Sequence, residues 1–466
     1  MSPLLAYGIA FFLGMLFQPY LLIPFFALIY FSGLKRGFLI ALVAGTGYFT
    51  HQTARPAPPS TAICGEGQLH INEIIPKSVF GKKKMLYKGV FKTFQTEDKR
   101  YKNLPVLFYL SDQRPSADRD WIVRGTLTPP FFTPEKNTSW LAVKGTFSLA
   151  EIRLYLKESV KGWVFKNISD KNSALLLSGL ITGDFDDREL KKAFSNLGLS
   201  HLLAISGFHF SIVALILAWL LKPFLSLKSR AKGMLVMLSL YCLFLGGSPS
   251  VLRAFIALSL FLLAPLFQAA SNSKNALGAA LLIILAIDPM AAENIGFQLS
   301  FLATGAILFG FLPAKAQLDA LFPSQSKAEI YKLSKFDRGV KVVLSQIKNV
   351  VALNLTISFV LFPVLLKLFQ TFPLASLVYN LFFPFLITLS IFLLILSILL
   401  PFLHPLNSAY TAFLLDLAKE APVDLIPPVK VDYVPETFII IYLTLVFSYI
   451  LHKNNSFKYT ISEINL

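Results

Sequence analysis

Long apolar runs fill both ends of this chain, and a segment in which polar and apolar residues alternate separates them. Residues 3–50 have the pattern of three short apolar helices, and the proline-rich linker HQTARPAPPS follows them. From residue 198 the apolar runs resume, and several approach the ~20 residues that a helix needs to cross a bilayer. The pattern predicts a polytopic α-helical membrane protein of about twelve helices, with the later ones near 200–221, 233–247, 251–268, 276–288, 295–312, 347–366, 372–400, 402–418 and 437–452.

Residues 61–150 have a different pattern, because short runs rich in β-branched and aromatic residues are separated by turn-forming residues. These runs are QLHINEII, MLYKGVFKTF, PVLFYL, DWIVRGTLT and WLAVKGTF. About five strands within fewer than a hundred residues predict a small β-barrel, and an OB-type barrel is one candidate.

A third pattern covers residues 148–167, where apolar residues recur at helical spacing with charges between them. We expect an amphipathic helix that lies on the membrane face. The predicted divisions of the chain are N-terminal membrane helices over 1–52, an inserted OB-like extracytoplasmic domain over 53–150, an interfacial helical linker over 151–197, the main transmembrane domain over 198–455 and a C-terminal tail over 456–466.

The composition and the distribution of charge also predict how the chain is oriented in the membrane. Only 15% of the residues are charged, whereas a soluble protein has about 25%. Residues 222–232 carry four basic residues and no acid, residues 313–348 carry seven against three, and residues 419–436 carry two against four. Because basic loops stay in the cytoplasm, we expect these basic loops inside, the barrel outside and a multi-pass protein of the inner membrane. The N-terminus lacks a signal peptide's basic region, so we expect retained helices there.

The predicted barrel is itself basic. Residues 53–150 hold 15 Lys and Arg against 8 Asp and Glu within a chain of net charge +17. Large external domains escape the topological bias, so topology does not explain this excess. Basic grooves with aromatic platforms bind single strands, and the candidate contacts are Lys82, Lys83, Lys84, Lys88, Lys92, Phe94 and Tyr101. The alternative is a solvated basic surface whose aromatic side chains turn into the barrel core.

The stretch GLSHLLAISGFHF places two histidines and a serine at the start of an apolar run. On a helix, Ser206 and His209 share a face, and His201 lies about two turns before His209. Polar groups inside a bilayer usually face partners or water. Three interpretations stay open. They are hydrogen bonding between helices beside Gly207, a polar lining for a conduit, and an intramembrane catalytic site, for which no orienting acid lies nearby.

Three further polar stretches interrupt the C-terminal apolar block. Arg253 lies about one turn into the helix after GGSPS, where it could reach the headgroups or face inward as a fixed positive charge. The stretch DPMAAENIGFQLSFLATGAI has the form of a broken helix that carries Gln298 and Ser300, and FPLASLVYNLFFPF adds Asn380. Non-helical backbone at membrane depth is tolerated where protein buries it or where it lines water.

Taken together, these stretches resemble the ComEC family of competence proteins, in which segments of the form GL-HLLAISG-H, S--RA, GFQLSF-A and a late proline and asparagine recur in this order. The resemblance covers nearly the whole chain and includes an external OB-type domain. It implies a channel, not an enzyme, that imports single-stranded DNA during natural transformation. It also implies a DNA path lined by His201, Ser206, His209, Arg253, Gln298, Ser300 and Asn380.

The chain also departs from many family members, which continue into a metallo-β-lactamase-like domain. Its six histidines form no metal motif, so we expect no metal or other cofactor and no built-in nuclease. Strand degradation would then come from a separate nuclease or not happen. The sequence contains no G-x-x-x-x-G-K-[ST] phosphate loop, so we expect a separate cytoplasmic ATP-driven motor. Membrane lipids are further partners, and a homodimer stays open. The alternative functions are a transporter or flippase of an anionic lipid or glycan, and an intramembrane enzyme that uses Ser206 and His209.

Overall fold

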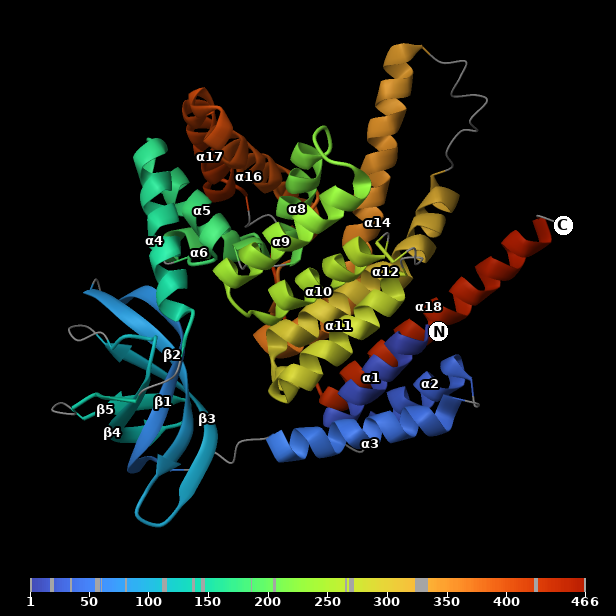
Figure 1. Cartoon of the computed structure of the whole chain (residues 1–466). Helices are drawn as coiled ribbons and strands as arrows, with labels where there is room; N and C mark the ends of the chain where they lie inside the picture. The colour runs from blue at the N-terminus through green and yellow to red at the C-terminus, as the bar shows by residue number, and fades with distance from the viewer. Residues whose placement is uncertain are drawn as a thin grey trace.

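A β-barrel lies beside a larger body of helices (Figure 1). The computed structural model describes residues 2–464 except 17–20, 34–35, 55–58, 60, 80–81, 111–114, 136–138, 144–146, 186, 204–206, 265, 268–271, 323–333 and 423–425. The side chains of residues 78–83 are also outside this description, as are those of residue 335 and of residues 453–464. The helical body comprises helices α1–α3, α5–α12 and α14–α18, and helix α4 (Ala150–Asn167) connects it to the barrel.

Five strands form the barrel: β1 (Ile63–Val79), β2 (Lys82–Gln95), β3 (Arg100–Leu110), β4 (Asp120–Thr128) and β5 (Phe131–Pro134). They are ordered β1-β2-β3-β5-β4, and the pairing of β1 with β4 closes the barrel. Strands β3 and β5 run parallel, and a short strand β6 (Leu141–Val143) is added to β4. The structure therefore has a closed five-stranded barrel where the alternating pattern predicts one.

Aromatic rings fill the interior of the barrel. The ring of Phe91 lies 4.9 Å from the rings of Phe94 and Phe132, measured between centroids. Phe91 and Phe94 are both fully buried. The sequence prediction that Phe94 stacks on DNA bases is therefore wrong. The cause of the error is a register shift between β1 and β2. Lys92 has no partner on β1, so Phe91 and Phe94 both point into the barrel.

Helix α4 takes part in two hydrophobic cores. Ala150 and Leu154, near its first turn, belong to the core of the barrel. Val164 and its neighbour Ile168 belong to a core in the helical body that also contains Leu394. Between these ends, the Lys157 ammonium lies 3.0 Å from the Asp184 carboxylate, and the two side chains are only 5% and 9% exposed. The predicted boundary between residues 150 and 151 therefore falls inside one continuous helix that both units share.

Hydrogen bonds join α5 (Lys171–Thr182) to α17 (His404–Lys419) near the end of α4. The Ser408 hydroxyl lies 3.0 Å from that of Ser169 and accepts from the Asp170 backbone N–H at 3.2 Å. The Asp170 carboxylate accepts from the Ser173 N–H at 2.7 Å and caps α5. Hydrogen bonds from Ser173 hold the pKa of Asp170 below its ordinary value. These bonds attach the α4–α5 corner to the last third of the chain.

The described helices overlap every predicted helical range. Two of them, α12 (Ile295–Leu321) and α14 (Lys335–Phe369), contain segments that are long and apolar enough to cross a membrane by length and composition. The number of crossings stays a prediction, because the other apolar helices are shorter. The remaining helices are α1 (Pro3–Met15), α2 (Leu22–Ser32), α3 (Gly37–Ala54), α6 (Arg188–Asn196), α7 (Ser200–Leu203), α8 (Gly207–Leu221), α9 (Leu227–Leu245), α10 (Pro249–Leu263), α11 (Ser273–Ile287), α15 (Ala375–Tyr379), α16 (Phe383–Leu399) and α18 (Glu436–Ile464).

Among the described residues, the helical body also contains two short 3-10 turns and a strand pair. Turn η3 (Pro289–Glu293) precedes α12, and turn η4 (Pro401–Leu403) precedes α17. Strands β7 (Thr371–Phe372) and β8 (Val429–Lys430) pair antiparallel.

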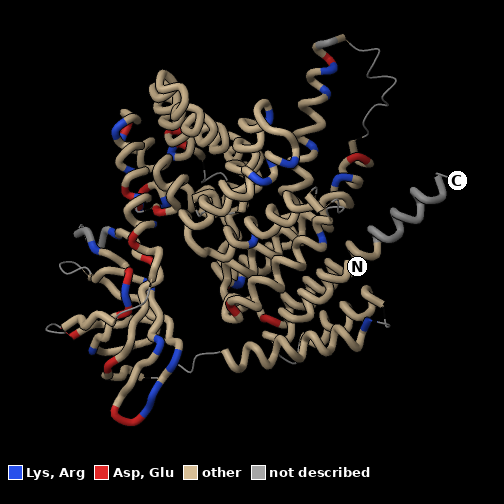
Figure 2. The backbone as a smooth tube through the Cα atoms, viewed as in Figure 1, with Lys and Arg blue, Asp and Glu red and all other residues tan. Residues whose placement is uncertain are grey.

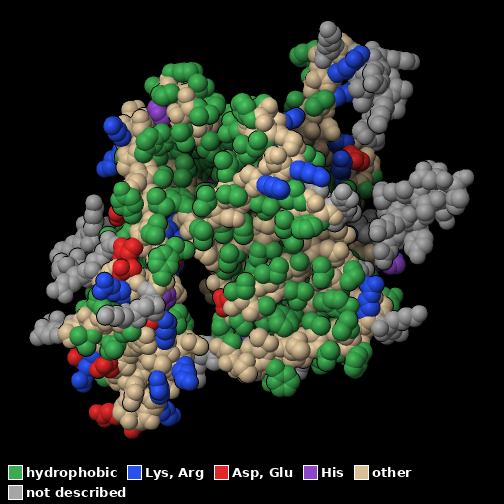
Figure 3. All heavy atoms as spheres, in the orientation of Figure 1, with side chains coloured by type: hydrophobic (Ala, Val, Ile, Leu, Met, Phe, Trp, Pro, Cys, Tyr) green, Lys and Arg blue, Asp and Glu red, His purple; other side chains and the backbone are tan. Residues whose placement is uncertain are grey.

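The face of the helical body that Figure 3 shows is rich in hydrophobic side chains. Helices α9 to α11 expose Val236, Leu240, Phe261 and Ile287 at 57–79% of their surface. Water-soluble monomers rarely expose continuous apolar patches of more than a few hundred Å². The apolar exterior is therefore suited to contact with lipid.

The N-terminal helices pack with their backbones in close contact. A Cβ atom added to Gly14 of α1 would lie 1.9 Å from the Ala44 carbonyl oxygen of α3. A Cβ atom added to Gly278 of α11 would lie 2.3 Å from the Leu5 nitrogen of α1. Glycine lets helices approach this closely in a membrane, where packing drives their association. Helix α1 is therefore fixed between α3 and α11.

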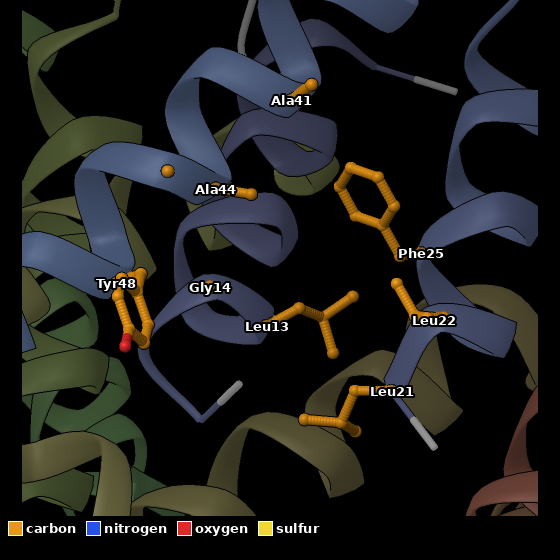
Figure 4. A pocket seen from close by; sticks show the side chains of 9 residues that line it. Leu13, Gly14, Leu21, Leu22, Phe25, Ala41, Ala44 and Tyr48 are labelled. Carbon is orange, nitrogen blue, oxygen red and sulfur yellow. The ribbon is translucent and has the colours of Figure 1, made fainter. Parts of the chain in front are cut away.

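An apolar pocket of about 440 Å³ opens beside this contact (Figure 4). Residues from α1, α2 and α3, together with Leu21 just before α2, form its walls, and none of them is charged. The pocket therefore lies apart from the polar residues that the sequence singles out. Its lining is Leu13, Gly14, Leu21, Leu22, Phe25, Ala41, Ala44, Gly45 and Tyr48.

Arg153 of α4 ties the barrel to the helical body. Its Nε donates to the Leu243 carbonyl oxygen in the last turn of α9 at 2.9 Å, and its Nη1 reaches the Asn72 carbonyl oxygen of β1 at 3.5 Å. A cation at a helix C-terminus satisfies free carbonyls and the helix dipole. Arg153 therefore touches both units at their junction.

We expect Arg153→Ala to loosen the barrel and to lower the free energy of unfolding by about 1–2 kcal/mol. Pulsed EPR between labels on Asp98→Cys and Arg188→Cys, in a Cys64→Ser/Cys242→Ser background, should show a broader distance distribution than the parent. The matched control is Arg124→Ala, because Arg124 is exposed and pairs with Glu135 within the barrel. An unchanged distribution in Arg153→Ala would contradict this prediction.

Candidate functional site

The segment that carries the two histidines forms two helices around a short stretch. Helix α7 contains His201, and helix α8 begins at Gly207 and contains His209. Residues 204–206 lie outside the described part of the chain, so the predicted alignment of Ser206 with His209 stays a prediction. His209 is 2% exposed, whereas His201 is exposed. The two histidines therefore have different surroundings.

Arg253 lies against the first residue of α8. A Cβ atom added to Gly207 would lie 2.6 Å from the Arg253 Nη2 atom. The Arg253 Nε donates to the Ser300 hydroxyl of α12 at 2.8 Å, and its guanidinium carbon lies 5.9 Å from the centre of the Phe301 ring. Arg253 therefore points into the helical body, which contradicts the alternative that it reaches out to the headgroups.

The other end of the same segment touches the late motif. Gly198 has φ +71, and a Cβ atom added there would lie 2.5 Å from Pro373 and 2.6 Å from Ser376. Asn380 ends the short helix α15, and its Oδ1 is buried without a hydrogen-bond partner among the described residues. The predicted helix over 372–400 is divided here, because α16 begins at Phe383 with a proline in its first turn.

Gln298 has a local role in the structure. Its Nε2 donates to the Ala292 carbonyl oxygen at 2.8 Å, which holds turn η3 against the start of α12. Asn294 caps the same helix by accepting from the Phe297 N–H at 3.1 Å. Whether Gln298 also lines a path stays a prediction.

The segment 198–207 thus contacts two of the other motifs directly and reaches the third through Arg253. Gly198 touches the late motif, Gly207 touches Arg253, and Arg253 bonds to Ser300. This places a guanidinium, a hydroxyl and a buried amide oxygen inside the mostly apolar helical body. A guanidinium in such surroundings can bind an oxyanion such as a phosphate. Among the described residues, no group of three or more His, Cys, Asp or Glu side chains could hold a metal ion.

Lys and Arg residues are distributed over the barrel (Figure 2), and the barrel strands contain the second group of predicted site residues. The Lys92 ammonium donates to the Asp120 carboxylate at 2.5 Å, and Gln68 and His70 contact the same fully buried carboxylate at 2.8 and 2.6 Å. Lys88 pairs with Glu73 at 2.8 Å. Two of the predicted lysines are therefore bound to acidic side chains on the barrel itself.

The other predicted contacts on the barrel are Lys82, Lys83, Lys84 and Tyr101. Lys84 is partly exposed, and Tyr101 packs partly against the barrel core. The side chains of Lys82 and Lys83 lie outside the described part of the chain.

A family model described as "Competence protein" matches residues 180–454. This range is more than half of the chain and contains all four polar motifs. The chain belongs to the competence protein family. No solved structure matches this competence protein.

Three curated relatives are similar to parts of this competence protein. ComE operon protein 3 of Bacillus subtilis is 30% identical over 29% of the chain and 18% of its own length. The uncharacterized protein MG316 homolog of Mycoplasma pneumoniae is 37% identical over 23% of the chain and 27% of its own length. Competence protein ComA of Neisseria gonorrhoeae is 31% identical over 26% of the chain and 18% of its own length. The chain thus matches about a fifth to a quarter of each relative.

Sequence reasoning missed several residues of this competence protein that position the site. Asn354 of α14 donates to the Leu377 carbonyl oxygen at 2.6 Å and holds α15 in place. Asp120 gathers three polar side chains on the barrel. An asparagine inside the apolar run of α14 is a signal that could have identified Asn354, because such a side chain needs a partner in lipid.

We expect Gly207→Ala to impair the competence protein without unfolding it. The added Cβ meets the flexible end of Arg253, so the guanidinium shifts away from Ser300 while the backbone stays in place. Displacement of the guanidinium from its place on the predicted DNA path should cost about 1.4 kcal/mol of its interaction with a strand, which predicts about a tenfold fall in DNA uptake. Gly162→Ala is the matched control, because nothing lies within 4 Å of its added Cβ. Uptake is measured with the variants at equal membrane abundance, and equal uptake by both would contradict the prediction.

Proposed function

We propose that this chain is a multi-pass protein of the inner membrane that conducts single-stranded DNA into the cytoplasm during competence. The observation that carries the proposal is the convergence on Arg253. Its guanidinium bonds to Ser300 and lies against Gly207, within a body whose exterior is apolar. Phosphates of a passing strand would exchange with the Ser300 hydroxyl at this cation. Few and spaced cations suit conduction, because a strand held too tightly cannot leave.

The family membership and the names of two relatives support a role in competence. ComE operon protein 3 and competence protein ComA match parts of the chain. The closed barrel has the strand order β1-β2-β3-β5-β4, and small Greek-key barrels of the OB type bind oligonucleotides. We infer that the barrel is an OB-type domain that receives the strand outside the membrane.

The energy for this transport would come from another protein. Each charge that crosses a membrane potential, negative inside, is opposed by about 2.3 kcal/mol per 100 mV. The sequence contains no G-x-x-x-x-G-K-[ST] phosphate loop that would let this chain use ATP. We propose a cytoplasmic ATP-driven motor that docks on the basic segments 222–232 or 313–348, and a separate nuclease for the second strand.

The experiment is uptake of fluorescent double-stranded DNA by cells with the gene, without it, and complemented with it. We expect deletion to leave label outside the inner membrane and complementation to restore it in the cytosol. Unchanged cytosolic label in the deletion strain would contradict the proposal and favour a flippase or an enzyme. Purified chain in vesicles should show no ATP-driven uptake alone, and such uptake would contradict the separate motor.

A further inference from the structure

We propose that the outer face of strands β2, β3 and β5 is a base-stacking platform for single-stranded DNA, centred on Tyr109 and Phe131. The proposal rests on the proposed function and names the surface on which the barrel would receive the strand. It replaces Phe94, whose ring is enclosed in the barrel core.

Strand register places these two aromatic side chains on one face. On β3, Phe108 points into the core, so Leu107 and Tyr109 point outward. Leu107 pairs with Phe131 across the parallel β3–β5 contact, so Phe131 points outward as well. Tyr109 is 42% exposed and Phe131 is 50% exposed. Two large, half-exposed aromatic side chains therefore lie on the outer face of neighbouring strands, one residue pair apart along β3.

The surroundings of these rings differ from those of the barrel's other aromatic side chains. The rings of Phe91, Phe108 and Phe132 pack on one another inside the barrel. Tyr109 and Phe131 make no ring contact or side-chain hydrogen bond with the described residues. Rings that stay half exposed on one face are available to stack on the bases of a ligand, because their contact with water is unfavourable.

Lysines flank this face at both ends. Lys88 pairs with Leu107 across β2 and β3, so its side chain lies beside Leu107 on the outer face. On β1 and β2, Lys77 pairs with Lys84. By strand alternation, these two side chains lie on the same face one row beyond Leu86, which pairs with Tyr109.

The charge of these lysines is available to a ligand. Among the described residues, Lys77 and Lys84 have no ion pair. The surface pair of Lys88 with Glu73 contributes only about 0–1 kcal/mol, so a phosphate can replace the carboxylate. Cations around stacked rings are the arrangement that binds single strands with little sequence preference.

The apolar face could also bind a saccharide, since some OB folds do. The lysines favour DNA, because a neutral saccharide gains nothing from them. The contributions of stacking and of charge to the binding affinity can be distinguished by varying the salt concentration. Loss of a ring weakens binding at every salt concentration, whereas loss of a phosphate contact also lowers the salt dependence.

The test uses the full chain in nanodiscs and a fluorescein-labelled thymidine oligonucleotide, followed by fluorescence anisotropy at several salt concentrations. We expect Tyr109→Ala and Phe131→Ala each to raise the Kd about 5- to 100-fold with an unchanged salt slope. Tyr109→Trp keeps a large ring at this position and should bind the oligonucleotide like the parent. Parental binding would show that the position tolerates substitution and that Tyr109→Ala loses affinity through the missing ring. Lys84→Ala should raise the Kd and lower the salt slope by about 0.7.

The matched control is Tyr155→Ala on α4, because Tyr155 is 70% exposed outside the barrel. It should leave the Kd unchanged. Parental affinity in both Tyr109→Ala and Phe131→Ala would overturn the platform, while loss of DNA uptake on gene deletion would leave the proposed function standing. Absence of oligonucleotide binding by the parent, or aromatic-dependent binding of a neutral oligosaccharide in its place, would also overturn the platform.

Discussion

Arg253→Ala is expected to reduce the DNA that reaches the cytosol about a hundredfold, because truncation of a buried hydrogen-bonded charge costs 2–5 kcal/mol or more at a site that uses it. Alanine removes the cation that bonds to Ser300 and leaves an apolar gap beside Gly207. A strand would then meet no positive charge at this point of its path. The measurement is cytosolic label after uptake of fluorescent DNA, with variants at equal membrane abundance.

Two variants sharpen this test. Arg253→Lys keeps the charge but loses the planar fork of donors, so it should recover only part of the uptake. Arg188→Ala is the matched control, because Arg188 is exposed on α6 and its replacement removes the same charge away from the proposed path. Uptake by Arg253→Ala equal to that by Arg188→Ala would remove Arg253 from the proposed path.

Gly14→Ala is expected to prevent accumulation of the folded protein. The added Cβ would lie 1.9 Å from the Ala44 carbonyl oxygen and 2.7 Å from its carbon, so two helix backbones must separate. Overpacking costs 1–3 kcal/mol and occasionally more, and we expect at least about 3 kcal/mol here because no side chain can move aside. Proteins are stable by only about 5–15 kcal/mol. The measurements are membrane abundance and the midpoint of thermal unfolding in detergent.

Gly45→Ala is the matched control on the neighbouring helix. Gly45 lies next to Ala44 and lines the same apolar pocket, but nothing lies within 4 Å of its added Cβ. This variant should accumulate like the parent and melt at the same or a slightly higher temperature, because alanine favours helix. Equal stability of Gly14→Ala and Gly45→Ala would show that the helices are less tightly packed than the structure indicates.

The amino-acid pattern predicted the elements of this fold better than their junctions. Alternation located four of the five barrel strands, whereas β5 (Phe131–Pro134) was missed because four residues after two prolines give no periodic signal. Pro384, in the first turn of α16, explains why the 372–400 range is divided in the structure. The shared core of α4 was not predicted, because an apolar residue in a sequence does not indicate which partner covers it.

The candidate site was predictable as a set of residues but not as contacts. The bond between Arg253 and Ser300 joins residues 47 positions apart, and no periodicity indicates such pairing. The error at Phe94 has a specific cause. Strict alternation from Phe91 turns Phe94 outward, and the register shift beside Lys92 reverses it. The same shift directs Lys92 to the buried Asp120.

The two ends of α4 have consequences for the order in which the chain is made. Its first turn completes the barrel core as soon as residues 150–154 leave the ribosome, whereas its last turn packs on Leu394. At about 5–20 residues per second, Leu394 follows Ile168 after roughly 10–50 s. During that interval the Asp170 backbone N–H also lacks its acceptor, the Ser408 hydroxyl, which is made later. We expect the barrel to fold early and to stay attached to an incompletely synthesised membrane domain. At that stage the C-terminal half of α4 is still exposed, so a quality-control protease could cleave there.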